Sequence, residues 1–167
     1  GISKGGLYWY FKSKDQLIFA VLDRMIQREF NTFLSEKSEL ESAYDQFMLL
    51  IDLVEKDMGR FNALMPVLFE FYAMGLRNAS IRKMLSKSLQ SYIDLIVPIL
   101  EQGIASGEFR SFDPIEGALA VGAVMEGTIL LKGYNPDLVD LHKHIRSGAE
   151  LLLKGLLVDP SKGELKE

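Results

Sequence analysis

Basic and aromatic residues are concentrated at the start of the chain. Residues 1–14 read GISKGGLYWYFKSK, with three lysines, no acidic residue and four consecutive aromatic residues. Lysine ammonium groups bind phosphates, glycines allow close approach, and a short helix that carries such groups fits a DNA groove. We therefore predict that this segment contacts DNA through Lys4, Gly5, Gly6, Tyr8, Trp9, Lys12 and Lys14.

The charge distribution supports a localised anionic partner. Residues 1–30 carry five basic and three acidic side chains, a balance of +2, so residues 31–167 carry −6 to give the net charge of −4. A small basic head on an acidic body favours one anionic contact region over general coating of nucleic acid. A basic helix end followed by aromatic core residues fits the same pattern, and both interpretations stay open at this point.

Catalytic chemistry has little support in the sequence. The chain has no cysteine, which excludes disulfides, cysteine zinc sites and thiol nucleophiles. The two histidines, His142 and His144, are two positions apart on an expected helix, so they point to different faces and cannot chelate one metal. Glycine-rich phosphate loops and nucleophile elbows are also absent from the sequence. We therefore predict no enzyme, no metal site and no cofactor.

The middle of the chain is richer in large apolar side chains than one buried stripe per helix requires. Aromatic and methionine side chains adapt to irregular apolar ligands, and polar groups such as Glu126 and Thr128 could orient them. An ordinary hydrophobic core is the alternative for each residue. We predict a pocket for a small apolar molecule, lined by Phe61, Asn62, Met65, Phe69, Tyr72, Met84, Ser88, Tyr92, Met125 and Ile129.

Helical spacing of apolar residues and local capping signals predict an all-α fold. Ser38 and Glu41 form a capping-box pair, Gly107 is placed to end a long helix, and Asp113 precedes a proline as at a helix start. Prolines 66 and 98 lie inside expected helices, where each should cause a kink or a break. The expected helices cover residues 3–11, 14–34, 38–58, 60–76, 80–106, 114–132 and 135–157.

The last two expected helices have the composition of a subunit interface. Residues 115–131 form a helix that is apolar nearly all round, so it needs cover on two sides. Small residues spaced four apart allow another helix to approach closely. A homodimer with a four-helix interface would cover the second side of this helix and would use the small residues for close packing. A central helix in a monomeric bundle is the alternative. The predicted interface residues are Ala118, Gly122, Ala123, Leu141, Ile145, Gly148 and Leu152.

Targeting signals are not evident in the sequence. The start lacks a charged leader followed by an apolar run, which is the pattern of a secretory signal. The most apolar stretch, residues 115–131, contains Glu116 and Glu126 and is too short and too charged to predict a membrane span. We therefore expect a cytoplasmic protein.

Residues 1–17, GISKGGLYWYFKSKDQL, resemble the latter part of the DNA-binding signature of TetR/AcrR-type transcriptional regulators. The resemblance implies that Tyr8 and Trp9 contact the DNA backbone and base methyls, and that Lys14 binds a phosphate. It places four residues near the bases at the start of the recognition helix: Ser3, Lys4, Gly5 and Gly6. The family pattern has two further helices before this one. We therefore expect the complete DNA reader to include residues before Gly1, or this chain to be unable to bind DNA.

The resemblance also implies the architecture and the function. Residues 1–37 would be the C-terminal part of a helix-turn-helix plus a connecting helix, and residues 38–167 a helical domain for ligand binding and dimerisation. The implied function is a ligand-responsive transcriptional regulator, most simply a repressor, that binds operator DNA as a homodimer and is released by an apolar small molecule. A helical small-molecule-binding and dimerisation module without DNA binding is the alternative.

Overall fold

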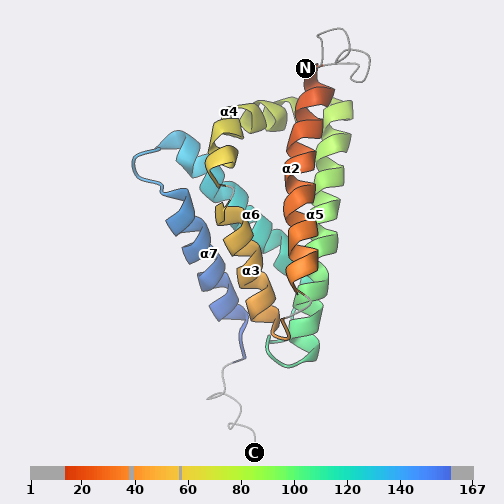
Figure 1. The fold of residues 1–167 in the computed structure, drawn as a ribbon, viewed down its shortest axis with the longest axis vertical. Helices are drawn as coiled ribbons and strands as arrows, with labels where there is room; N and C mark the ends of the chain where they lie inside the picture. Colours follow the sequence, from red (N-terminus) through yellow and green to blue (C-terminus); the bar gives the residue numbers. More distant parts are fainter. Residues whose placement is uncertain (1–13, 38–39, 57, 159–167) are drawn as a thin grey trace, which may run out of the picture.

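The computed structural model describes residues 14–37, 40–56 and 58–158, and these residues form six α-helices without a β-sheet. The all-α prediction is therefore confirmed. Figure 1 shows the helices gathered into one bundle, with α2 and α5 side by side. In chain order the helices are α2 (Lys14–Glu36), α3 (Ala43–Lys56), α4 (Met58–Gly75), α5 (Ala79–Ala105), α6 (Pro114–Tyr134) and α7 (Leu141–Leu156).

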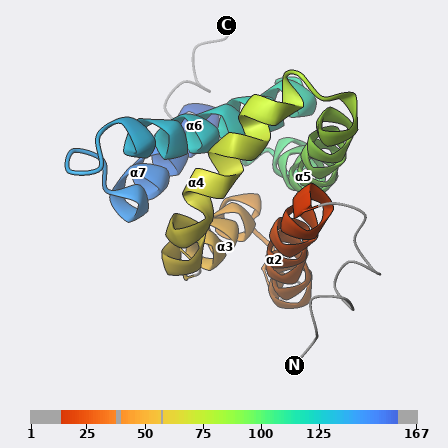
Figure 2. The same cartoon turned by 90° about the horizontal axis from the view of Figure 1, so that it is seen from above.

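Helix α5 is the central element of the bundle. It contacts α2, α3, α4 and α6, while α7 packs against α3 and α6. Seen from above, α4 runs across the bundle from the end of α3 to the start of α5 (Figure 2). The core between the helices contains Phe33, Phe47 and Leu100, each at most 1% exposed. Burial of side chains of this size contributes about 1.5–3 kcal/mol each.

Helix α3 begins at a cap supplied by a distant part of the chain. The Glu108 carboxylate accepts hydrogen bonds from the backbone N–H groups of Ala43 at 2.8 Å and Tyr44 at 2.9 Å. It also accepts from the Ser42 hydroxyl at 2.7 Å, and Ser42 Oγ in turn accepts from the Asp45 N–H at 3.1 Å. A negative group at a helix N-terminus is favoured by the helix dipole as well as by these bonds. Glu108 therefore joins the start of α3 to the turn between α5 and α6.

This cap corrects the predicted start of the helix. The capping box of Ser38 and Glu41 was wrong, because α3 begins at Ala43 and Ser38 lies outside the described residues. Spacing along the sequence reveals only local acceptors, whereas the acceptor for Tyr44 is 64 positions away.

Replacement of Glu108 with alanine should lower the free energy of unfolding by about 1–3 kcal/mol, because the N–H groups of Ala43 and Tyr44 lose their acceptor. Ala43 is 1% exposed, so water does not readily replace the carboxylate. Urea unfolding at fixed protein concentration measures the change. Glu101→Ala is the matched control, since Glu101 is exposed on α5 and should change stability by less than about 0.5 kcal/mol. Equal effects of the two changes would contradict the capping role.

Helix α5 ends as the sequence predicted. Gly107 follows the last turn with φ +76°, a left-handed conformation that favours glycine. The Phe109 N–H donates to the Gly103 carbonyl at 2.9 Å, and the Phe109 ring fills the space beside Gly103 where a Cβ would stand. Phe109 is 2% exposed, so this turn is anchored in the core.

Two other local predictions need correction. Of the kink or break predicted at Pro66 and Pro98, the break does not occur, because α4 and α5 each continue through their proline, and the kink stays a prediction. The predicted start of the last helix at residues 135–137 was also wrong: α7 begins at Leu141, after its cap Asp140. The reason is a local side-chain contact. Lys132 Nζ, at the end of α6, donates to the carbonyls of Pro136 and Val139 at 2.8 Å each and holds this segment as a turn.

Candidate functional site

The predicted DNA-contacting residues lead directly into α2. Ser3, Lys4, Gly5, Gly6, Tyr8, Trp9 and Lys12 lie outside the described residues. Lys14 is the first residue of α2. The predicted DNA-contacting segment therefore enters the described structure at the start of α2.

Helix α2 contacts α4 through a pair of aromatic rings. Phe19 and Phe71 are stacked with ring centroids 6.3 Å apart and an interplanar angle of 26°. Phe71 is 1% exposed, and offset stacking adds to the energy of its burial. Position 72, next on α4, is a tyrosine that faces α6. Adjacent residues of α4 therefore contact α2 on one side and the candidate ligand site on the other.

Two tyrosines and one carboxylate meet where α4, α5 and α6 come together. Tyr72, on α4, donates its hydroxyl to Glu126 of α6 at 3.4 Å. Tyr92, on α5, donates its hydroxyl to the Ala118 carbonyl of α6 at 2.9 Å. Burial first, and then the nearby Glu126 charge, raise the pKa of both phenols above the ordinary value of 10.0. Both side chains therefore stay neutral at physiological pH and act as hydrogen-bond donors.

Glycines of α6 make room for aromatic rings in this region. A Cβ at Gly122 would stand 3.2 Å from the Tyr92 ring, and a Cβ at Gly133 would stand 2.9 Å from the Phe69 ring. The close approach predicted for Gly122 is therefore made by an aromatic side chain of the same protomer. Because Gly122 has no side chain, the Tyr92 ring can lie close to α6, beside Glu126.

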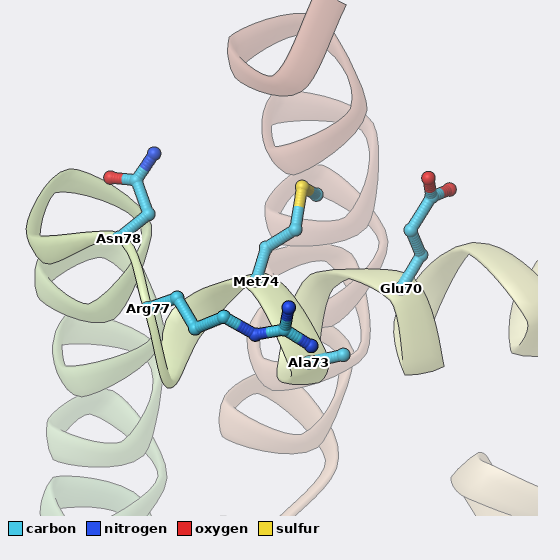
Figure 3. Close-up of a pocket in the computed structure, with 5 residues that line it drawn as sticks. All are labelled: Glu70, Ala73, Met74, Arg77 and Asn78. Atoms are coloured by element: carbon cyan, nitrogen blue, oxygen red, sulfur yellow. The ribbon is translucent and has the colours of Figure 1, made fainter.

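The structure contains two open cavities near the turn between α4 and α5. The larger, about 320 Å³, is lined by Tyr72, Gly75, Leu76, Arg82 and Leu85. The other, about 250 Å³, is lined by residues of α4 and of the turn that follows it (Figure 3). These lining residues are Glu70, Ala73, Met74, Arg77 and Asn78.

The predicted pocket residues are only partly brought together. Phe69, Tyr72, Tyr92 and Met125 are half-buried, and of these Tyr72 and Tyr92 interact with Glu126. Met84 and Ser88 are half-buried on α5. Met65 and Ile129 belong to the core, at 8% and 7% exposed, and Asn62 is exposed. The side chain of Phe61 is not among those that the structure describes. Of the predicted set, the larger cavity includes Tyr72 alone.

The residues of that cavity missed by the sequence analysis are Gly75, Leu76, Arg82 and Leu85. They surround the turn between α4 and α5. The signal for them in the sequence was a leucine beside a basic residue at a predicted helix end. Leu76 is 83% exposed, which is unusual for a large apolar side chain flanked by a glycine and an arginine.

The predicted dimer residues also separate into two groups. Ala118, Leu141 and Ile145 are 0%, 3% and 1% exposed, so they pack inside the protomer and their assignment to the interface is corrected. Gly148 lies against Val124, where a Cβ would be 2.7 Å from Val124 Cγ1. Leu152 is half-buried, whereas Ala123 is exposed. Of these residues, Gly148 packs against Val124 of α6, whereas Gly122 packs against Tyr92 of α5, both within the same chain.

A different face of α6 and α7 is apolar and exposed. Among the described residues α6 is the one helix long and apolar enough to cross a membrane, with a mean hydropathy of 1.4 over its most apolar window, of which 22% is buried. The large exposed apolar residues on this face and the adjoining turn are Ile115, Leu119, Leu130, Leu131, Tyr134, Leu138 and Leu151.

An ion-pair cluster fixes the rotation of α7. Arg146 Nη2 lies 2.5 Å from Asp52 Oδ1 and 2.6 Å from Glu55 Oε2 of α3, and these hydrogen bonds raise the pKa of the guanidinium. The polar side of α7 is thus held toward α3. Leu151 remains 72% exposed on another side of the helix.

The chain is similar to bacterial transcriptional regulators in sequence and in fold. The family model described as "Bacterial regulatory proteins, tetR family" matches residues 1–21. The transcriptional regulator YfiR of Bacillus subtilis is 27% identical over 116 residues, which cover 69% of this chain and 56% of YfiR. QacR of Staphylococcus aureus is 23% identical over 154 residues, which cover 92% of this chain and 81% of QacR. The chain thus spans little more than half the length of YfiR.

Solved structures share the same arrangement of helices. A transcriptional regulator of Saccharomonospora viridis in complex with choline matches with a TM-score of 0.78 at 17% identity, over 95% of this chain and 83% of the other. The regulator FadR of Bacillus subtilis, in complex with stearoyl-CoA, matches with a TM-score of 0.69 at 22% identity, over 92% and 82%. At these sequence identities the two matches show that the fold is shared.

Proposed function

The chain belongs to the tetR family of bacterial regulatory proteins, and we propose that it is a ligand-responsive transcriptional repressor. The observation that carries this proposal is the position of α2. The helix begins within the segment that matches the family model, residues 1–21, and its Phe19 stacks on Phe71 of α4. The division at residues 37 and 38 into a DNA-reading part and a helical body forms part of the proposal. So does a cytoplasmic location, where such a repressor meets its operator.

Ligand binding in the helical body is supported by the open cavity beside Tyr72 and by two similar folds that hold small molecules, choline in one and stearoyl-CoA in the other. A ligand changes operator affinity only if it binds the two states of the repressor with different affinity. A shift of α4 would change the contact between Phe71 and Phe19 and so tilt α2.

Homodimerisation is supported by the exposed apolar face of α6 and α7. A dimer places two recognition helices against two half-sites of a palindrome, and their separation sets operator affinity. The side chains of Leu130, Leu151 and Ala123 lie on this face and would pack against their copies in an isologous four-helix interface.

Gel-shift titration of the complete protein against a palindromic operator tests this function. Binding should weaken steeply with salt, since phosphate contacts release counterions. Lys14→Ala should weaken binding across operator sequences and lower the magnitude of the salt slope by about one. Lys154→Ala is the control, because Lys154 lies at the end of α7, far from the start of α2 (Figure 1). An unchanged slope for Lys14→Ala would contradict its phosphate contact, and absence of any operator binding would favour the DNA-independent module.

A further inference from the structure

A second run of basic residues begins near the turn between α4 and α5. Residues 71–93 carry four basic side chains and no acidic one. Because residues 31–167 together carry −6, the others among them carry −10. The acidic body therefore has one positive region of its own. Its four residues are exposed, and we refer to them as the α5 basic surface: Arg77, Arg82, Lys83 and Lys87.

Contacts within the protomer account for only one of these charges. Arg82 Nε donates to the carbonyl of Gly75, the last residue of α4, at 3.1 Å, so this guanidinium caps α4. Among the described residues no ion pair includes a member of the α5 basic surface. Glu70 lines the smaller cavity together with Arg77 (Figure 3), and the two side chains are not ion-paired.

The energetics of α5 oppose this arrangement of charges. Lys83 and Lys87 are four positions apart in the helix, and like charges at this spacing share a face and destabilise it. The first turn of α5 contains no acidic residue, although the helix dipole favours a negative charge there. The stability of the protomer therefore does not explain these lysines, whereas an anionic partner outside the protomer does.

The α5 basic surface lies at the end of the bundle where the DNA-reading segment joins it. Helices α2 and α5 pack side by side, and both begin at this end (Figure 1). Lys14, the predicted phosphate ligand, is the first residue of α2. Residues 1–14 carry three lysines and no acidic residue, so their charge repels this surface and does not complement it. A DNA duplex at this end attracts both positive regions.

We propose that the α5 basic surface contacts the phosphates of DNA that flanks the operator. This inference rests on the proposed repressor function and extends the DNA-contacting surface from the reader to the helical body. Double-stranded DNA carries one negative charge per ~1.7 Å of its axis, and basic side chains bind it by releasing counterions, without reading the sequence. Arg77, Lys83 and Lys87 supply the contacts, while Arg82 adds its charge from the cap of α4.

Two duplexes that share one palindromic operator test this contact by fluorescence anisotropy. The short duplex ends at the half-sites, and the long duplex adds about 10 bp of arbitrary sequence, one helical turn, at each end. The complete wild-type protein should bind the long duplex at least ~10-fold more tightly at about 50 mM salt. Two phosphate contacts, one per protomer, predict that this gain falls about 10-fold between about 50 and 200 mM salt.

Matched variants locate the source of the gain. Lys83→Gln combined with Lys87→Gln should abolish the gain and leave the affinity for the short duplex unchanged. Arg110→Gln combined with Lys154→Gln removes the same charge from exposed residues at the opposite end of the bundle and should keep the gain (Figure 1). Lys83→Glu should weaken binding of the long duplex and yet raise the melting temperature, because an acidic–basic pair four apart replaces two like charges.

The outcomes separate this inference from the proposed function. Equal affinity for the two duplexes, or a gain that survives the double lysine substitution, would overturn the flanking contact while binding of the short duplex would still support a repressor. Equal losses in the two double variants would assign the gain to net charge and also overturn it. Absence of binding to either duplex overturns the repressor function and this inference together. Equal affinity for the two duplexes, combined with lysine-dependent co-sedimentation with phosphatidylglycerol vesicles, would assign the surface to a membrane instead.

Discussion

Replacement of Phe71 with alanine should cost about 3–5 kcal/mol of unfolding free energy, the range for removal of a buried phenylalanine ring. Phe71 is 1% exposed and stacks on Phe19, so its loss opens a cavity between α2 and α4. Such a loss is a large part of the stability of a domain of this size. Urea unfolding at a fixed protein concentration measures it, since subunit association makes stability depend on concentration.

Phe71→Leu separates the packing role of this side chain from its role in signalling. Leucine keeps most of the apolar volume but removes the stacked ring. We expect a ligand of the helical body to bind this variant nearly as well as the wild type, while the effect of the ligand on operator affinity falls toward none. Phe109→Leu is the matched control, because Phe109 is equally buried but lies in the turn between α5 and α6, away from α2. An equal loss of coupling in both variants would show that general destabilisation, and not the ring pair, is the cause.

Leu151→Glu should convert the proposed dimer to a monomer. Leu151 is 72% exposed in the protomer, so a charged side chain there does not disturb its own core. In a four-helix interface the same position is buried, and an unpaired carboxylate would cost several kcal/mol at each of two symmetric sites. Light scattering should show the mass fall from twice 18.8 kDa to 18.8 kDa. Operator affinity should fall with it, because a monomer holds one half-site.

Leu34→Glu provides the control for the interface. Leu34 is a 50% exposed leucine on α2, outside the apolar face of α6 and α7. This variant should remain a dimer with unchanged thermal unfolding. A wild-type protein that is already monomeric at micromolar concentration, or a Leu151→Glu protein that stays dimeric, would contradict the assignment of this face.

The number and type of helices could be predicted because apolar residues repeat with helical spacing over long segments. Helix ends could be predicted where the cap is local, as at Gly107 and Asp113. They were missed where a side chain outside the expected capping residues determines the end. Glu108 caps α3 across 64 or more positions, and Lys132 holds as a turn the residues expected to begin the last helix.

The candidate site was less predictable because α6 is apolar on nearly every side. Helical spacing identified Gly122 and Ala118 as contact positions but could not say which neighbour they contact. In the structure Gly122 contacts the Tyr92 ring, and Ala118 is buried within the protomer. Glu126 was recognised as a polar group among apolar residues, whereas its place between two tyrosines depends on how α4 and α5 cross α6.

In the proposed mechanism α2 acts as a lever. Phe33 is fully buried near its C-terminal end, where Lys37 also lies 5.6 Å over the Phe33 ring, and we take this end as the fulcrum. At a rise of 1.5 Å per residue, Phe19 stands about 21 Å and Lys14 about 28 Å from that fulcrum. A displacement applied at Phe19 is therefore magnified about 1.4-fold at Lys14. A tilt of about 5° would move the start of the helix by about 2.5 Å, a distance comparable to the length of a hydrogen bond.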